Sequence, residues 1–463
     1  MTIAAFGCKD RVPLRAAVTG SRLVNSWQDD GTVRKYPPPD LATTAVAALV
    51  PEGGGWREVP GTVNADGTFT IDDVGTGRYL LRLTGPYPIP LYFELTTRSV
   101  DLGTDAVGRP GGIVGASSTP ATFSLTGLSP WGPSGRLELV STGARVDAVI
   151  PAAPAAGATA GDFVLDFKGL LLPAAGDLGW VLQHETTNVG GEFVTAVVRS
   201  APIAFTSSLG DGQAVTWPMA LGTPPQGTLG VAVRRADFST LLPEVAPGGA
   251  TLSTITVTVR AVPRTWGAVS SVSAELLRVN LPPADVSLGT LSYGRPFPSW
   301  FMELRDVGWN VQWQAPAAFG ASAVSGSAFG QRVEPAAGAP ANVAPALGPA
   351  RLPRIGGLDA AQPQAGVGLT PTLTWSPPLL GAPNRYEVSL SELPVAPAGW
   401  PAQRAWFSVA GTSLALPPGV LVAGKVYLAT VYAVREPNRD PAAPLRITVP
   451  FELAPLITAP FTP

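Results

Sequence analysis

Reactive and metal-binding side chains are scarce in this chain. One cysteine, Cys8, and one histidine, His184, occur among its 463 residues. A lone cysteine excludes an intrachain disulfide and a cysteine-based metal cluster. A metal site built on the histidine lacks the partner ligands that such sites require. We therefore predict that the protein holds no metal and no cofactor.

Charge is also low, and long apolar runs are missing. Charged residues make up 14% of the chain, and 31 Lys and Arg against 33 Asp and Glu give a net charge of −2. No basic block is present, which argues against binding to nucleic acid or to an anionic membrane surface. No apolar run is long enough for a transmembrane helix.

Turn-forming residues and apolar residues are abundant instead. The chain contains 52 glycines and 50 prolines, and 45% of its residues are hydrophobic. This composition fits many short strands joined by tight turns, with enough apolar side chains for packed cores. A chain of this length is expected to form roughly three to four domains.

The clearest strand pattern lies between Val63 and Leu83, VNADGTFTIDDVGTGRYLLRL. Asp66-Gly67 suits a tight turn because both residues tolerate positive φ. After this turn the apolar residues alternate with polar ones, first at Phe69 and Ile71 and then from Tyr79 onward, which is the pattern of half-buried strands. The stretch resembles the repeated motif of carboxypeptidase-regulatory-like (transthyretin-like) β-sandwich domains. That resemblance implies a first sandwich over residues 8–110.

The middle of the chain is a succession of strand patterns without a recognised family. A Leu-Gly-Thr sequence recurs at residues 102–104, 221–223 and 288–290, and we interpret it as the end of a module. These ends divide the middle into β-sandwiches over residues 111–220 and 221–316, although a single larger sandwich is an open alternative. Residues 317–353 are rich in Ala, Gly, Ser and Pro, which predicts a linker.

The C-terminal region carries a second spaced pattern. Trp375 lies in the strand pattern TLTWSPP, and a second strand pattern begins at Arg385. Leu421, Gly424 and Tyr427 then follow at L-x-x-G-x-x-Y spacing. This set resembles a fibronectin type III domain over residues 354–456. The resemblance implies that Tyr427 is a corner tyrosine whose hydroxyl bonds to backbone, and it implies nothing about activity.

The best candidate for a binding surface is a group of tryptophans. Trp300 precedes Trp309 and Trp313, and the last two would share one face of a strand. Exposed indoles in a row can stack on sugar rings or anchor a protein partner. The alternative is that this face belongs to the core, because tryptophan that alternates with valine usually packs inside.

Catalytic patterns are weak. A serine hydrolase would need a nucleophile elbow, and no G-x-S-x-G accompanies His184. Asp29-Asp30-Gly31 and Asp72-Asp73 lack the alternating oxygen ligands of a calcium loop, which favours turn roles. Paired carboxylates for hydrolysis are recognised by geometry and not by spacing. A hydrolase with an unrecognised site in the middle region therefore stays open as an alternative.

The N-terminus adds a question of localisation. Ala5-Phe6-Gly7-Cys8 resembles a bacterial lipoprotein cleavage site, but no complete signal peptide precedes it. The sequence predicts an all-β protein of tandem immunoglobulin-like and prealbumin-like sandwiches. The resemblance to arrays of such modules implies a non-catalytic bacterial cell-envelope or secreted protein in structure or adhesion, with Cys8 as its lipidation candidate. A carbohydrate-binding accessory protein is the alternative. A protein or polysaccharide surface partner and self-association are both compatible with this interpretation.

Overall fold

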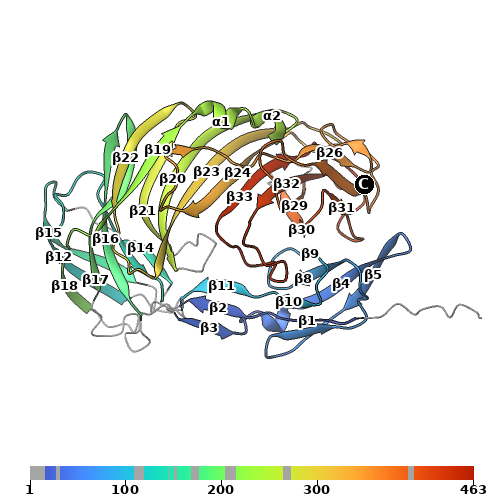
Figure 1. Cartoon of the computed structure of the whole chain (residues 1–463), viewed down its shortest axis with the longest axis horizontal. Helices are drawn as coiled ribbons and strands as arrows, with labels where there is room; N and C mark the ends of the chain where they lie inside the picture. The colour runs from blue at the N-terminus through green and yellow to red at the C-terminus, as the bar shows by residue number, and fades with distance from the viewer. Residues whose placement is uncertain are drawn as a thin grey trace, which may run out of the picture.

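The computed structural model describes residues 16–27, 32–108, 119–143, 145–150, 154–167, 177–203, 215–263, 273–394 and 401–463. Cys8 and Asp29-Asp30-Gly31 lie outside these residues. The described chain is built from β-strands with only short helices, which confirms the predicted all-β class. Its strands form four successive sandwiches, which we call the first to fourth modules (Figure 1).

The first module spans residues 16–108. A sheet of order β10-β1-β7-β6 packs on strands β9-β8-β4-β5, and a third sheet of order β11-β2-β3 extends beside them. Phe69, Ile71, Leu81 and Leu83 fill its core, as the strand pattern predicted. Its elements are β1 (Val18–Ser21), β2 (Val24–Trp27), β3 (Val33–Tyr36), a 3-10 helix (Leu41–Thr43), β4 (Ala45–Glu52), β5 (Gly55–Pro60), β6 (Thr62–Val63), β7 (Thr68–Ile71), β8 (Tyr79–Thr84), β9 (Leu91–Leu95), β10 (Ser99–Asp101) and β11 (Thr104–Val107).

The second module covers residues 119–220. A sheet of order β15-β12-β18 packs on strands β14-β13-β16-β17 around Phe123, Trp131, Phe163 and Trp217. Its strands are β12 (Thr119–Thr126), β13 (Arg136–Ser141), β14 (Val146–Ile150), β15 (Ala160–Phe167), β16 (Gly179–Val189), β17 (Glu192–Ile203) and β18 (Val215–Ala220).

The third module covers residues 226–343. A sheet of order β22-β19-β25 packs on strands β21-β20-β23-β24, and two short helices cross the top of this sandwich (Figure 1). Its elements are β19 (Gln226–Val233), α1 (Arg235–Ser239), α2 (Leu242–Val245), β20 (Ala250–Pro263), β21 (Ala274–Leu281), β22 (Val286–Gly294), β23 (Phe301–Ala315), β24 (Val324–Pro335) and β25 (Asn342–Val343).

The fourth module covers residues 351–463. A sheet of order β27-β26-β28-β31 packs on strands β33-β32-β29-β30. The backbone N–H of Val422 donates to the Tyr427 hydroxyl at 2.9 Å, so this tyrosine is tied to backbone as predicted. The strands are β26 (Arg351–Ile355), β27 (Leu358–Asp359), β28 (Thr372–Ser376), β29 (Arg385–Glu392), β30 (Ala402–Val409), β31 (Ser413–Ala415), β32 (Tyr427–Arg435) and β33 (Phe451–Ile457).

One sheet of each module joins its neighbour edge to edge, which the sequence did not predict. The result is a single 16-stranded sheet of order β14-β13-β16-β17-β21-β20-β23-β24-β33-β32-β29-β30-β9-β8-β4-β5. Three short seams link the modules: β17 with β21, β24 with β33, and β30 with β9. Strand edges have unpaired N–H and C=O groups, and pairing them inside the chain satisfies those groups.

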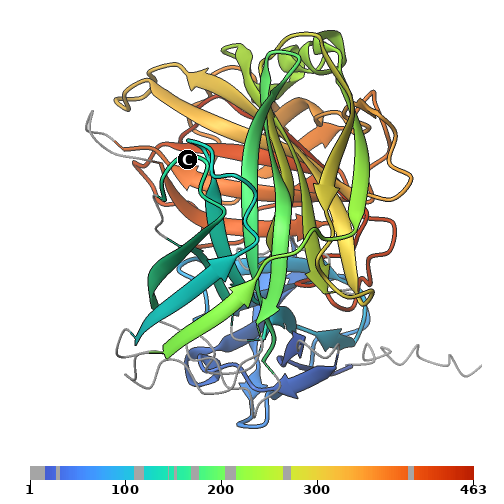
Figure 2. The same cartoon turned by 90° about the vertical axis from the view of Figure 1, so that its left-hand side faces the viewer.

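The modules follow a closed path rather than an extended array. The second, third and fourth modules form an arch, and the first module lies across its open side (Figure 1). Arg145 of the second module donates from Nε to the carbonyl of Val107 at 2.7 Å and from Nη2 to the Tyr36 hydroxyl at 2.9 Å. Figure 2, turned by 90°, shows the long strands of the arch standing above the first module. The first and last modules are therefore neighbours in space, which the tandem order of the sandwiches did not predict.

The predicted linker over residues 317–353 is also wrong for much of its length. β24 runs through it and pairs with β23 from Ala315↔Val324 to Leu304↔Pro335. Small residues predicted a linker, but here they make room for large partners. Gly330 lies opposite Trp309 and Gly326 opposite Trp313, and a Cβ on either glycine would overlap the indole. The ring of the aromatic residue covers the glycine across the strand pair.

The Leu-Gly-Thr repeats divide the chain less regularly than expected. Leu221 is buried at the end of the second module, and Gly222 bridges back to Ser200. Leu288, in contrast, lies inside β22, and the long strands β23 and β24 of the same sandwich follow it in the chain. The third module therefore ends near residue 343 instead of 316.

Candidate functional site

The tryptophans predicted to bind a partner do not form an exposed row. Trp309 is 5% exposed and Trp313 is 8% exposed, and both belong to the core of the third module. Phe238 of α1 meets the Trp309 ring edge-on at 5.7 Å. Trp300 is half-buried before β23, with its ring 4.1 Å from that of Phe301. Trp309 and Trp313 therefore belong to the core, as the alternative interpretation proposed. Their buried rings offer no surface on which a ligand could stack.

His184 lies in a buried ion cluster of the second module. Its Nε2 lies 2.9 Å from Oε2 of Glu138, and the two side chains are 1% and 4% exposed. Arg136 contacts the same carboxylate at 2.8 Å, and its guanidinium lies 3.8 Å from Glu275 of β21. The cluster joins neighbouring strands of the long sheet, with His184 and Glu138 buried and Arg136 partly exposed. This placement suits a structural role.

The acidic pair within the described residues, Asp72-Asp73, does not build a cation site. Asp73 has positive φ in a turn and lies 3.6 Å from Arg57, while its backbone carbonyl accepts from the same arginine. Within the described part of the chain, no cluster of three or more His, Cys, Asp or Glu side chains is arranged to hold a metal. Asp72-Asp73 therefore has the turn role that the sequence favoured.

A groove at the seam between the fourth and first modules is the strongest candidate for a binding site. We call it the junction groove. Its cavity volume is about 380 Å³, within the range of small-molecule sites. Five segments from both modules supply its walls: the β8–β9 loop, β9, β29, β30 and the β32–β33 loop. Its lining residues are Tyr87, Pro88, Ile89, Leu91, Arg385, Glu387, Gln403, Trp406, Pro444, Leu445 and Ile447.

The seam beneath the groove interlocks two cores. β30 and β9 run parallel, with Trp406, Phe407 and Ser408 opposite Leu91, Tyr92 and Phe93. Alternation sends Phe407 and Tyr92 to the fourth module's core, where their rings stack at 4.6 Å. Trp406 points to the other face and packs on the first module's core, with its ring 5.7 Å from that of Phe93. Each module thus covers part of the other's apolar surface.

Charged side chains on this face are paired and balanced. Arg385 donates from Nε to Oε1 of Glu387 at 3.1 Å and also bonds Glu436, which is fully buried. Burial alone would lower the pKa of Arg385, but the attraction of Glu387 and Glu436 raises it. Burial and the neighbouring charge of Arg385 lower the pKa of Arg439 to about 10. The charged residues that line the groove itself, Arg385 and Glu387, carry one charge of each sign.

The β32–β33 loop, residues 436–450, forms one wall of the groove and is held by hydrogen bonds and an ion pair to both modules. Glu436 accepts from the Thr448 hydroxyl at 3.0 Å, and its backbone N–H donates to Oδ1 of Asn384 at 3.1 Å. Further along, Arg446 forms an ion pair with Asp101 of the first module at 2.7 Å. The backbone N–H of Asp101 donates to the Ala442 carbonyl at 2.7 Å. The groove is therefore preformed.

Sequence reasoning missed the junction groove. Trp406 stands alone in QRAWFSV and has no second tryptophan at strand spacing. Its partners Tyr87 and Leu445 lie more than three hundred residues apart in the chain. Only the parallel pairing of β30 with β9 brings them together. Strand periodicity could have placed Trp406 on the polar face of its strand, but no local signal indicates the seam.

The fold and the groove define a protein of fused β-sandwiches. Comparisons with known proteins do not narrow this class further. No family model matches the chain, and no curated protein matches it. Similar solved structures include a leucine-rich repeat protein from Bacteroides thetaiotaomicron, at 13% identity over 50% of this chain and 26% of that chain, with a TM-score of 0.14. This chain thus spans about a quarter of that protein's length.

Two further solved structures cover more of the chain. A streptococcal ancillary pilin is 13% identical over 67% of this chain and 95% of that chain, with a TM-score of 0.11. The Bacillus anthracis TIE protein is 8% identical over 68% of this chain and 47% of that chain, with a TM-score of 0.14. Scores this low carry no conclusion about function. In the described residues, no helix has the length and apolar character to cross a bilayer.

Proposed function

We propose that this protein is a non-catalytic structural or adhesive component of the bacterial cell envelope or its exterior. It acts as a rigid body that holds a fixed surface, with the junction groove as the concave part of that surface. Cys8 stays our candidate for lipidation. The single observation that supports this proposal is the continuous 16-stranded sheet, which makes four sandwiches one mechanical unit.

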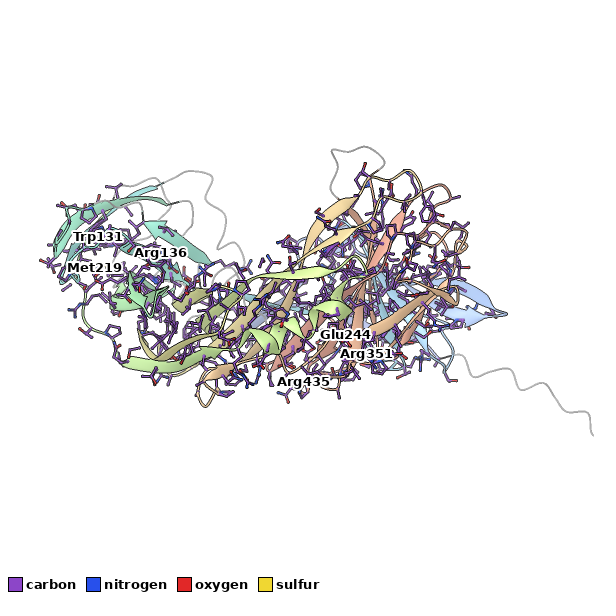
Figure 3. All side chains as sticks on the ribbon, turned by 90° about the horizontal axis from the view of Figure 1, so that it is seen from above. Trp131, Arg136, Met219, Glu244, Arg351 and Arg435 are labelled. Atoms are coloured by element: carbon purple, nitrogen blue, oxygen red, sulfur yellow. The ribbon has the colours of Figure 1, made fainter. Side chains whose placement is uncertain are left out.

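A rigid body of this kind suits a protein that bears mechanical load or presents a binding surface more than it suits an enzyme. Buried ion clusters lie beside the seams, such as Arg332 and Arg435, which both contact Glu452 at 3.1 and 2.7 Å where β24 meets β33. Glu244 of α2 and Arg351 of β26 lie 4.0 Å apart across the same pair of modules (Figure 3). His184, the side chain that a serine hydrolase would use as its base, is held in such a cluster by Glu138.

Two measurements test this proposal: the cellular location of the protein and the effect of its deletion on surface attachment. In the encoding bacterium, we expect a tagged full-length protein to be cleaved when intact cells are treated with protease. A deletion strain should attach less to surfaces, and the wild-type gene should restore attachment. A cytoplasmic marker protein is the control for cell lysis. Protection of the tagged protein in intact cells, with release only on lysis, would refute the proposal.

A further inference from the structure

We infer that the junction groove binds an uncharged saccharide, which stacks on Trp406 and is held by Glu387 and Gln403. This inference names the ligand class of the proposed adhesive surface and rests on that proposal for its biological setting. Three features of the groove support it: a ring surface, open polar atoms beside that surface, and a balanced charge.

The ring surface comes from two aromatic side chains that line the groove. Trp406 is half-buried, with its ring anchored edge-on against Phe93. Tyr87, also half-buried, lines the groove from the β8–β9 loop. Rigid aromatic rings bury large area at low entropic cost. Sugar rings present apolar C–H faces that pack on such surfaces.

Open polar atoms flank the indole. The Oε1 atom of Glu387 accepts from Arg385, while its Oε2 has no bonding partner in the described part of the chain. Gln403 is exposed, and its Nε2 donates to the Ser389 hydroxyl at 2.8 Å, which leaves its carbonyl oxygen toward solvent. Carboxylate and amide oxygens accept hydrogen bonds from hydroxyl groups. These atoms and the indole lie on one face of strands β29 and β30.

Charge and backbone pairing exclude other ligand classes. The charged residues that line the groove are Arg385 and Glu387, which carry opposite charges, so the groove favours neither an anionic nor a cationic ligand. A peptide that binds by strand addition needs an open strand edge. In this groove, β30 and β9 are already paired with each other, and side chains alone face a ligand. An uncharged, hydroxyl-rich ring compound fits these conditions best.

The experiment measures saccharide binding to the full-length protein by isothermal titration calorimetry. The probes are maltohexaose, cellohexaose, laminarihexaose and xylohexaose, with trigalacturonate as the anionic comparison and a proline decamer as the peptide comparison. We expect at least one neutral oligosaccharide to bind with a Kd below about 1 mM. We expect trigalacturonate and the proline decamer to bind at least about tenfold more weakly.

Variants locate the site. Gln403→Ala removes an exposed side chain and should weaken binding about fivefold, the loss expected for one hydrogen bond. Glu387→Gln and Trp406→Phe should weaken it about tenfold or more, because each loses a contact that the ligand buries. Trp56→Phe, in the groove on the opposite face of the same seam, is the matched control and should bind like wild type. Circular dichroism checks that each variant is folded.

Several outcomes would overturn the inference. One is the absence of binding by every neutral probe at about 10 mM, and another is tighter binding of the proline decamer. A third is saccharide binding that Gln403→Ala and Trp406→Phe leave unchanged. Surface exposure of the protein on cells without saccharide binding would refute this inference alone, while a protected protein that binds saccharide would refute the proposed function alone.

Discussion

Glycine and tryptophan form complementary pairs in the third module. Trp309 faces Gly330 across β23 and β24, and Trp313 faces Gly326 four residue pairs further from the seam. A tryptophan in a densely packed core needs a partner without a side chain, because interiors leave no void for extra atoms. The same pairs explain why a glycine-rich segment forms a regular strand here. Each indole replaces the side chain that its glycine lacks.

This pairing predicts that Gly330→Ala destabilises the protein by about 1–3 kcal/mol, because the added methyl group forces the indole of Trp309 from its position. Urea-induced unfolding followed by circular dichroism measures the change. Gly411→Ala is the control, since no atom lies within 4 Å of a Cβ at that position. Equal stability of the two variants would contradict the interpretation of β24 as a packed strand.

At the scale of elements, three short strand pairings decide the architecture. Each seam pairs only three residues on either side, far fewer than the pairings within a module. Packing beneath the seams supplies the rest. Val107, Val262, Leu304, Val333 and Phe451 bring the first, third and fourth modules into one apolar cluster. A short pairing is sufficient when the cores on either side are continuous.

The seam between β24 and β33 predicts a pH dependence. Burial raises the pKa of Glu452 above its ordinary 4.5, against the attraction of Arg435 and Arg332. The folded state therefore holds this proton more tightly than the unfolded state. The resulting stability is fully present below pH 4.5 and is lost as pH rises through the raised pKa.

Glu452→Gln removes this titration. We expect the stability of wild type relative to the variant to fall as the pH increases from about 4 to 8. Urea unfolding at several pH values measures this difference. Glu58→Gln, whose side chain is 49% exposed in a surface pair with Arg82, is the control. A difference that is constant or grows with pH would contradict the assignment.

At the scale of the whole molecule, the first module depends on the last. Leu49, Leu80 and Tyr92 belong to strands of the first module but are buried in the core of the fourth. Trp406 and Leu445 of the fourth module in turn cover the core of the first. Modules that share apolar surface in this way unfold as one unit. Independent tandem domains would instead keep their cores separate.

We therefore expect residues 1–110, produced alone, to be less stable than the same residues in the full chain. Three newly exposed large side chains cost roughly 1.5–3 kcal/mol each. Thermal unfolding and binding of a hydrophobic dye measure the effect. A fragment with Leu80→Ser and Tyr92→Thr should bind less dye than the unchanged fragment. An unmodified fragment that is as stable as the intact protein would refute the interlocked cores.

Much of the local structure was predictable. The turn at Asp66-Gly67 forms between β6 and β7, because Gly67 adopts positive φ and the Asp66 carboxylate accepts from the N–H of Thr68. Tyr427 makes its predicted bond to backbone. For the candidate site, the sequence directed attention to Trp300, Trp309 and Trp313, of which the structure buries Trp309 and Trp313 in the core. Trp309 and Trp313 alternate with valine, and alternation alone does not tell which face meets a partner sheet.

The sequence by itself determined the all-β class, because alternating apolar residues and Gly and Pro turns act over a few neighbouring positions. With one cysteine and one histidine, the sequence also rules out an intrachain disulfide and a site built on several histidines. How the sandwiches join could be learned only from the tertiary structure. The backbone N–H and C=O groups of an edge strand can pair with any other strand, so the side chains of that strand do not specify its neighbour. The junction groove exists only because β9 and β30, far apart in the chain, meet at such an edge.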